Sequence, residues 1–516
     1  MRRIISLVLA VAVICCMTIP ALAVEIAVPL TAEPVTFRIM VARENLSQNS
    51  YPDKECVQFT EQQTGIHIEW EEVPSSAWTE KVSLAFASGD LPDAFLGKVD
   101  VVSNMDQLTA LDGYFAEAPN ILEMFETLPD IRGSLTLSDG HIYSLPIGDA
   151  DVKNQINTIA YINKVWLEKL NLAMPTTVDE FYNVLVAFRD NDPNGNGEKD
   201  EIPLLVSASS NAAKINNLFC YFGTMENNGH VRVQDGKVIF TPSEDAYFEA
   251  LQFIHKLYAE GLMNSEYYTE DFQQFQAKGA ADPCRVGVCL EWYIDNIIGG
   301  AHVADFTYMS PLTGPHGDMI WCSDLSPNSP VGNLAGFTIT TACKDPGLLV
   351  RWYDYINSNL DILNLWNYGP ENVIWRYTDD GRWELFNDNV PEGSSSSQIR
   401  RTLGTGPAGP LYAYSRFRGP QAEKYAARIA AKVEANSAYA PYLPAETLIN
   451  GFGDADEEAE RNLLLTEIDH YLDQFRANAV VQGITEADWQ KHLERIKTLS
   501  IDEYLGYWQS YYDAHK

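Results

Sequence analysis

The sequence predicts an α/β protein with parallel strands, and three observations support this class. Residues 35–97 alternate between short apolar strand patterns and amphipathic helix patterns. Apolar residues make up 46 % of the 516 residues, which is enough to build a large core. A chain of this length also exceeds what one domain usually holds, so two or three domains are expected.

The elements that open the chain follow one another as strand, helix, strand, helix and strand. Gly65 and Gly89 stand where the two helices should stop, because glycine readily adopts the left-handed conformation that ends a helix. Strands that alternate with helices form parallel sheets, and ligands of such sheets bind at the carboxyl ends of the strands. The five elements are expected at residues 35–42, 52–65, 66–73, 76–90 and 93–97.

Beyond residue 150 the predicted helices are longer. Segment 176–192 opens with a capping box, in which Thr177 and Glu180 cap each other's backbone N–H groups, and continues with one apolar face. Segment 500–512 begins in the same way with Ser500 and Glu503. The serine-rich stretch at residues 393–398 is expected to be a hinge or loop, and the last hundred residues should be mostly amphipathic helices.

The first residues have the pattern of a secretory signal peptide. Two arginines precede the apolar run of residues 4–17, and Ala21 and Ala23 occupy the small-residue positions before a cleavage site. Residues 1–23 are therefore expected to be removed by cleavage after Ala23. The apolar run is also too short to span a membrane. Cys15 and Cys16 lack the small preceding residue that lipid modification needs, so no lipid anchor is expected.

The net charge limits which partners the protein can bind, and the cysteines indicate whether it contains disulfides. A formal net charge of −35 argues against nucleic acid and anionic membranes, since both require a basic face. The chain is expected to be a monomer outside the cell or in a periplasm. Six cysteines lie beyond the signal, with no C-x-x-C pair; Cys284 and Cys289 should point to opposite faces of a strand. Buried thiols are expected for these residues rather than disulfides.

An oxygen-rich loop at residues 189–204 indicates calcium. Calcium takes six to eight oxygens from carboxylates, side-chain amides and backbone carbonyls, and glycines permit the tight turn. One register is EF-hand-like, starts at Asp190 and ends at Glu201. The favoured register starts at Asp192, because Pro203 disfavours a second EF-hand helix. Its ligands are Asp192, Asn194, Asn196, the backbone carbonyl of Glu198, Asp200 and Glu201, with Gly197 at the sharp turn. A solvated turn without metal is the alternative.

Long stretches of the chain resemble the extracellular solute-binding proteins that serve ABC importers of oligosaccharides. The resemblance covers almost the whole mature chain. It is carried by "TGIHIEWEEVPSSAWTEKVSLAFASGDLPDAFLG", by "DGHIYSLP" and by "INKVWLEKLNLAMPTTVDEFYNVLVAFRDNDPNGNGEKDEIPL", which matches the subgroup with an EF-hand-like calcium loop in the second register. "GFTITTACKDP", "NYGPENVIW" and "GITEADWQKHLERI" also fit. Many relatives in single-membrane bacteria are lipoproteins, and this signal departs from that pattern.

The resemblance implies two α/β lobes of the periplasmic-binding-protein type, with a ligand cleft between them. The first lobe is expected at residues 35–148 and 333–395, and the second at residues 149–332 and 396–516. The implied function is to capture an oligosaccharide and deliver it to the membrane permease of an ABC transporter, without catalysis. The calcium would be structural and would lie in the second lobe.

Sugar binding needs flat apolar rings together with hydrogen-bonding groups. The predicted contacts lie near the ends of predicted strands or helices, or in a loop between the lobes; they are Arg43, Glu44, Trp78, Glu291, Trp292, Trp375 and Arg416. Two rival functions share these features: a secreted glycoside hydrolase or lyase, and a solute receptor for a sensor kinase. The G-x-G-x-x-G match at residues 404–409 contains Pro407 and does not open a helix, so a dinucleotide site is excluded.

Overall fold

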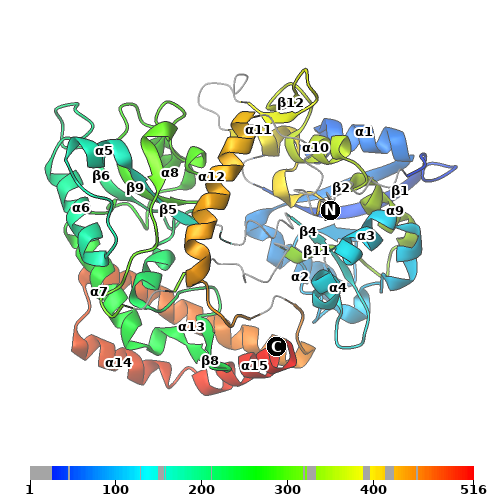
Figure 1. Ribbon diagram of the computed structural model, residues 1–516. Helices are drawn as coiled ribbons and strands as arrows, with labels where there is room; N and C mark the ends of the chain where they lie inside the picture. The colour runs from blue at the N-terminus through cyan, green and yellow to red at the C-terminus, as the bar shows by residue number, and fades with distance from the viewer. Residues whose placement is uncertain are drawn as a thin grey trace, which may run out of the picture.

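The computed structural model has two lobes, each built around its own sheet (Figure 1). This confirms the predicted two-lobed α/β class. The structure describes residues 26–515 except 45–46, 128, 149–155, 157, 211, 318–319, 322–332, 387–395, 413–422 and 449–450. The predicted signal peptide, Cys322 and Arg416 lie outside the described residues.

The first lobe contains a five-stranded sheet with the order β2-β1-β3-β11-β4. β1 is parallel to β2 and β3, as the sequence predicts, with Val35 opposite Ile66 and Ile39 opposite Ala94. β11 comes from far along the chain and runs antiparallel to both β3 and β4. The strands are β1 (Val35–Arg43), β2 (Ile66–Pro74), β3 (Ala94–Leu96), β4 (Ser144–Ile147) and β11 (Asn333–Ile339).

The helices of the first lobe begin and end close to where the sequence predicts them. Gly65 and Gly89 have φ angles of 76° and 74°, and their N–H groups donate to the carbonyls of Glu61 and Ala85. The left-handed backbone therefore ends both helices. The helices of this lobe are α1 (Glu55–Thr64), α2 (Trp78–Ser88), α3 (Pro119–Thr127), α4 (Pro129–Leu135), α9 (Pro346–Ile356), α10 (Leu360–Tyr368) and α11 (Ser396–Leu403). A hairpin of β12 (Trp375–Tyr377) and β13 (Trp383–Leu385) follows α10.

The second lobe contains a four-stranded sheet with the order β10-β5-β9-β6. β5 is antiparallel to β9 and β10, whereas β6 is parallel to β9. The strands are β5 (Ile159–Asn163), β6 (Ile202–Leu205), β9 (Val286–Glu291) and β10 (Phe306–Tyr308). The helices are α5 (Lys164–Lys169), α6 (Val178–Asp190), α7 (Asp245–Ala259), α8 (Phe272–Gly279) and α12 (Glu423–Tyr439).

A layer of C-terminal helices completes the second lobe. The hairpin of β7 (Val231–Gln234) and β8 (Lys237–Phe240) packs with α13 (Ala455–Gln482), α14 (Glu486–Ile496) and α15 (Ile501–His515) in a separate apolar cluster. Figure 1 shows this layer along the lower edge of the second lobe. The predicted predominance of helices at the C-terminus is confirmed.

Both predicted capping boxes differ from the structure. Thr177 caps α6 by accepting from the Glu180 N–H at 3.2 Å, but the Glu180 carboxylate accepts from Thr176, one residue earlier. Ser500 has a φ of 51°, and its backbone carbonyl, rather than its hydroxyl, accepts from the Glu503 N–H. An N-cap serine normally has extended backbone, so this conformation does not suit the predicted box.

Two apolar cores correspond to the two sheets, and successive segments of the described chain belong in turn to one core and to the other. Ile147, Leu334 and Tyr412 belong to the first core, whereas Ile159 and Trp321 belong to the second. The changes of core therefore lie between Ile147 and Ile159, between Trp321 and Leu334, and between Tyr412 and the part of α12 that packs in the second core. The lobe boundaries predicted from the sequence stay a prediction. We propose that residues 396–412 belong to the first lobe instead of the second.

The described cysteines are buried thiols, as the sequence predicts: Cys56, Cys220, Cys284, Cys289 and Cys343. Burial raises the pKa of Cys56 to about 12, which keeps its thiol protonated and unreactive at neutral pH. Within the described part of the chain, no helix is both long and apolar enough to cross a bilayer.

Candidate functional site

The end of β9 carries Glu291 and Trp292, two of the predicted ligand contacts. The Glu291 side chain is buried and accepts from the Trp292 N–H at 2.7 Å and from the Asn296 side-chain amide at 3.2 Å. Burial raises the pKa of Glu291 to about 7, although these two donors and Lys432 act to lower it. A carboxyl group with this pKa can both accept and donate hydrogen bonds near neutral pH.

Trp292 exposes 42 % of its surface, although it follows a fully buried strand. Its backbone carbonyl accepts from the Tyr161 hydroxyl at 3.2 Å, which fixes the backbone at this point. The other two predicted tryptophans, Trp78 and Trp375, are only 6 % and 3 % exposed. Trp292 is therefore the one predicted tryptophan with a face available to a ligand.

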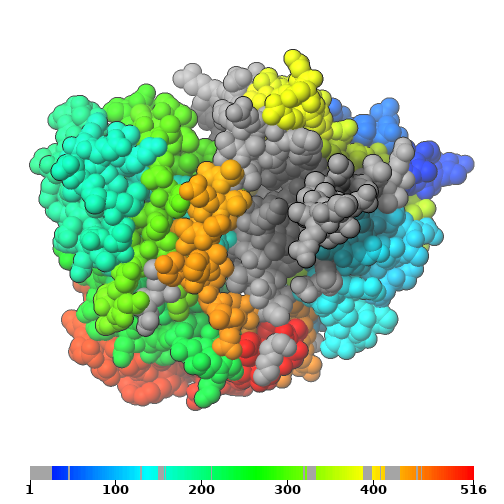
Figure 2. All heavy atoms as spheres, in the orientation of Figure 1, coloured from blue at the N-terminus to red at the C-terminus, as the bar shows by residue number. Residues whose placement is uncertain are grey.

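Helix α12 lies beside this strand end and adds residues that the sequence reasoning missed. Lys432 is 3 % exposed and lies 5.6 Å from the centre of the Tyr293 ring, and Glu434 accepts from the Tyr308 hydroxyl. The neighbouring Val433 is 42 % exposed. Figure 2 shows that α12 forms part of the molecular surface, next to segments of the second lobe. The only sequence signal was a lysine within an alanine-rich helix, which would normally suggest solvent.

Arg43 and Glu44 lie at the carboxyl end of β1, as predicted. Arg43 donates to the carbonyls of Ser47 and Gln48, and its Nε lies 3.5 Å from a Glu72 carboxylate oxygen. Glu44 accepts from the guanidinium of Arg401, on α11. Both side chains therefore belong to a network that joins the end of β1 to α11, and both stay partly exposed.

Lys54 holds this edge of the first lobe together, although no pattern in the sequence indicates this role. Its ammonium group donates to the carbonyls of Arg401, Thr402 and Gly404 at 2.7–2.9 Å and to the Ser47 hydroxyl at 3.0 Å. The side chain is buried, and burial lowers its pKa to about 8. A cation at the C-terminus of α11 is favourable because the last carbonyls of a helix carry partial negative charge.

Two of the predicted contacts are core residues in this structure. The Trp78 ring packs against Phe95, and its indole N–H donates to the Lys98 carbonyl at 2.6 Å. The Trp375 indole donates to the Gly369 carbonyl at 2.7 Å, inside the first core. A buried ring with a satisfied N–H has neither a free face nor a free edge for a sugar, so neither residue fits the predicted role.

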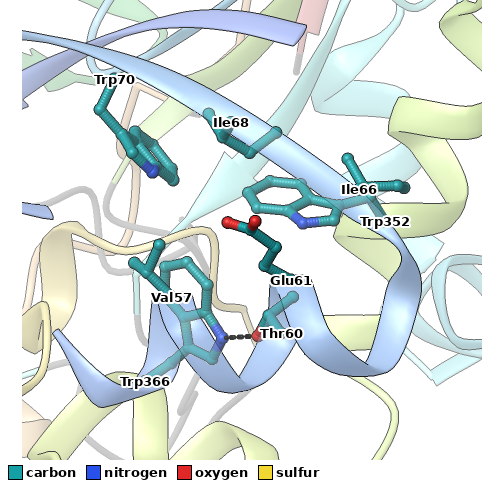
Figure 3. Close-up of a pocket in the computed structure, with 8 residues that line it drawn as sticks. All are labelled: Val57, Thr60, Glu61, Ile66, Ile68, Trp70, Trp352 and Trp366. Atoms are coloured by element: carbon teal, nitrogen blue, oxygen red, sulfur yellow. Dashed lines mark hydrogen bonds between the residues drawn. The ribbon is translucent and has the colours of Figure 1, made fainter. Parts of the chain in front are cut away.

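A small cavity in the first lobe is also lined by tryptophans (Figure 3). It has a volume of about 10 Å³ and lies among α1, β2, α9 and α10, with Trp70, Trp352 and Trp366 on its walls. Figure 3 shows the Glu61 carboxylate pointing into the space between the rings. Ligand pockets usually measure about 300–1,000 Å³. The cavity is therefore too small for an oligosaccharide, and its lining elements all belong to one lobe.

The predicted calcium loop connects α6 to β6 and turns at two glycines with φ angles of 78° and 82°, Gly195 and Gly197. The Asp192 carboxylate accepts from the N–H groups of Gly195, Asn196 and Gly197 at 2.7–3.1 Å. The segment after the loop is a strand rather than a helix. Asp192 therefore organises the loop from within, which favours the register that starts at this residue.

The other predicted ligands converge on the interior of the same loop. The side-chain amides of Asn194 and Asn196 both lie 3.0 Å from Oδ1 of Asp200. Rotating either amide by 180° would present its oxygen instead of its nitrogen at the same place. Glu198 has an exposed side chain, which suits the predicted use of its backbone carbonyl alone.

Glu201 provides the test of whether this loop suits a cation. Both of its carboxylate oxygens are buried, and neither accepts a well-formed hydrogen bond. Burial raises the pKa of Glu201, and the negative charges of Asp192 and Asp200 raise it further. A buried carboxylate without a partner is unfavourable, and a cation would remove the penalty. The described His, Cys, Asp and Glu residues nowhere form a compact set of three ligands, but calcium also accepts amide and carbonyl oxygens.

The model of the bacterial extracellular solute-binding protein family matches residues 44–359, which is more than half of the chain. The chain belongs to this family. Members of the bacterial extracellular solute-binding protein family are binding proteins rather than enzymes, so the glycoside hydrolase and lyase alternatives are set aside.

Two curated relatives extend the comparison. The chain is 30 % identical over 518 residues to the fructooligosaccharide ABC transporter substrate-binding protein FusA of Streptococcus pneumoniae, covering 94 % of this chain and 91 % of FusA. It is 32 % identical over 232 residues to Lipoprotein LipO of Bacillus subtilis, covering 44 % of this chain and 45 % of LipO. The similarity to FusA therefore spans both lobes.

The fold is also shared with solved structures. The chain is similar to FusA in complex with kestose, with a TM-score of 0.79 and 28 % identity, covering 93 % of this chain and 99 % of FusA. An EF-hand mutant of FusA in complex with fructo-nystose gives the same TM-score and coverage at 26 % identity.

Proposed function

We propose that this solute-binding protein captures a neutral oligosaccharide outside the cytoplasm and delivers it to the permease of an ABC transporter. The observation that supports this most strongly is the similarity to FusA over nearly the full length of both chains. A fructooligosaccharide is the first ligand class to test, because it is the class that FusA is named for. The chain is proposed to act as a monomer, and its net charge of −35 disfavours nucleic acid as a partner.

The proposed ligand site lies between the two lobes. Trp292 would stack on one sugar ring, while Glu291 and Lys432, which are 4 % and 3 % exposed, would support it from within the second lobe rather than reach the sugar. Arg43 and Glu44 would meet the same ligand from the first lobe, in positions set by Lys54 and α11. Contacts from both lobes favour the closed state, because a ligand shifts an equilibrium only through its differential affinity for the two states.

We further propose that the loop between α6 and β6 holds one structural calcium ion. Its ligands would be the side chains of Asp192, Asn194, Asn196, Asp200 and Glu201 and the carbonyl of Glu198. The unpartnered Glu201 carboxylate and the existence of an EF-hand mutant of FusA both support this. The ion would neutralise the loop and attach α6 to β6, and it would take no part in sugar recognition.

The proposed location is extracytoplasmic, with residues 1–23 removed as a signal peptide. Membership of an extracellular family supports this location. The relative LipO is named as a lipoprotein, whereas Cys15 and Cys16 of this chain lack the preceding small residue. We therefore propose a protein released without a lipid.

Calorimetric titration tests the proposed function. Kestose, longer fructooligosaccharides and unrelated trisaccharides such as maltotriose should be compared, and the products should be analysed for cleavage. We expect one saccharide to bind without turnover, and Trp292→Ala to weaken that binding at least about tenfold, or about 1.4 kcal/mol. Leu463→Ala is the matched control, because Leu463 is also exposed and apolar but lies on α13. Absence of binding by every saccharide would contradict the proposal.

A further inference from the structure

A second hollow lies in the layer of C-terminal helices of the second lobe. It has a volume of about 370 Å³, runs between α13 and α14 and ends at the turn of Gly483 and Ile484. Figure 1 places both helices in the layer along the lower edge of that lobe. We call this hollow the α13–α14 groove. Its size lies within the range of small-molecule sites, about 300–1,000 Å³.

Aromatic rings form one wall of the groove, and they lie nearly parallel. The Phe475 and His492 ring centres are 3.9 Å apart with an angle of 10° between the planes, and Tyr471 lies 5.7 Å from His492 at 9°. Both Tyr471 and Phe475 stay partly exposed, although they pack against buried neighbours. The stacking covers the facing sides of Phe475 and His492, so a sugar ring could pack only on the outer faces and edges of the part-exposed rings, Tyr471 and Phe475.

His492 belongs to this wall as a neutral ring. Burial lowers its pKa to about 4, so it carries no charge at neutral pH. Its Nε2 lies 2.8 Å from the Pro242 carbonyl and must donate to it, since a carbonyl can only accept. Its Nδ1 then accepts from the Tyr471 hydroxyl at 2.9 Å. Tyr471 keeps its oxygen lone pairs available on the groove side.

The rim supplies hydrogen-bonding groups without net charge. Asn478 and Gln482 lie four residues apart on α13, are exposed, and have no partner for their side-chain amides among the described residues. The two cations of the rim are already matched: Lys491 pairs with Asp488 at 2.9 Å, and Arg495 lies 3.7 Å from Glu467. An acidic ligand would have to compete with these carboxylates, so the charges favour a neutral one.

We propose that the α13–α14 groove is a second carbohydrate site, which binds a neutral oligosaccharide of two or three rings. The rings of Tyr471 and Phe475 stack against the sugar, and the amides of Asn478 and Gln482 bond its hydroxyls. The site is separate from the interlobe site and binds more weakly, because one open wall leaves much of the sugar in water. It lets the protein hold on to a polysaccharide while the cleft takes up a shorter chain.

Binding at two sites is tested by titrating the full-length mature protein with kestose, maltotriose and cellotriose to about 10 mM, where a site of about 1 mM affinity would saturate. We expect a weak class of binding beside the tight one. The double variant Asn478→Ala with Gln482→Ala should weaken the second class at least tenfold and leave the tight class unchanged. It should fold normally, since both amides are exposed and alanine favours helices. Gln490→Ala, an exposed residue of α14 outside the groove, is the matched control.

Three results would overturn the proposal. The first is a single class of binding for every glycan, and the second is a double variant that retains the weak class. The third is self-association in sedimentation experiments that the double variant abolishes, which would make the groove an interface between copies of the chain. Trp292→Ala keeps the two sites distinguishable, because it should remove the tight class of binding and retain the weak class. A weak class without any tight class would refute the proposed cleft function and leave the groove standing.

Discussion

Replacing Glu201 by glutamine should change the stability of the protein in opposite directions with and without calcium. Both oxygens of its carboxylate are buried and neither accepts a well-formed hydrogen bond, and the charges of Asp192 and Asp200 repel it. Glutamine removes that charge, so the variant should unfold at a slightly higher temperature than the parent in chelator. With calcium present, the variant lacks a charged ligand, so the ion should bind it weakly.

The size of the effect follows from mass action. Calcium at about 100 times its Kd stabilises the folded state by about 2.7 kcal/mol. In a unit of about 300 residues, the size of the second lobe, this corresponds to a rise in Tm of about 4 °C. The parent protein should show a shift of this size between chelator and calcium, and Glu201→Gln should show less than about a third of it. Differential scanning calorimetry of the mature protein measures both.

The pH dependence of the calcium-free protein gives a second readout. Because burial raises the pKa of Glu201, its stabilising contribution is complete below the unfolded pKa of about 4.3 and is lost as pH rises through the folded pKa. The parent should therefore lose stability over that range more steeply than Glu201→Gln does. Other carboxylates contribute to both curves, so only the difference between them is informative.

Glu198→Gln is the matched control for charge. It removes one negative charge from the same loop, but Glu198 is predicted to offer only its backbone carbonyl, and its side chain is exposed. Its calcium shift should equal that of the parent. The reasoning would be refuted if Glu201→Gln kept the full shift, or if Glu198→Gln lost as much of it.

Three further outcomes are expected. Burial acts to lower the pKa of His230, but Glu226 and Asp469 outweigh it and raise it to about 9. The stability that this histidine adds is complete below about pH 6.5 and disappears as pH rises to about 9. Glu226→Gln should lower the free energy of unfolding by about 3 kcal/mol, measured by urea unfolding at pH 7. Lys54→Met should cost about 2 kcal/mol in the same assay, because it leaves carbonyls of α11 without their donor; an unchanged urea midpoint would contradict this. Mass spectrometry of the exported protein should find Val24 at its N-terminus without a lipid, and a modified cysteine would refute that.

The local elements near the N-terminus could be predicted from the sequence because their signals are local. The alternation in β2 and the glycines after α1 and α2 depend only on neighbouring residues and on backbone conformation. The predicted loop at residues 393–398 is wrong for residues 396–398, the part that the structure describes, and the reason is the opposite one. Helix α11 begins at Ser396 and packs on α10, so tertiary contacts outweigh a serine-rich sequence.

The ligand residues could be predicted only in part. The three predicted tryptophans, Trp78, Trp292 and Trp375, differ only in how far each side chain is buried. Burial depends on elements that are far apart in the sequence, so a local pattern cannot distinguish the three. Lys432 and Lys54 were missed because a lysine normally indicates an exposed surface. The proposed calcium loop was easier to predict, since its proposed ligands lie within ten consecutive residues, and the same residues form a loop in the structure.

Small-angle X-ray scattering tests the central claim most directly, because the proposed function requires two lobes that close on a sugar between them. The mature protein should be measured alone and with the saccharide that binds most tightly in calorimetry, beside Trp292→Ala over the same range of sugar concentrations. We expect the radius of gyration of the parent to fall on binding, and the variant to need at least about ten times more sugar for the same fall. A radius that does not change in the parent at saturation would contradict closure of the lobes on the ligand.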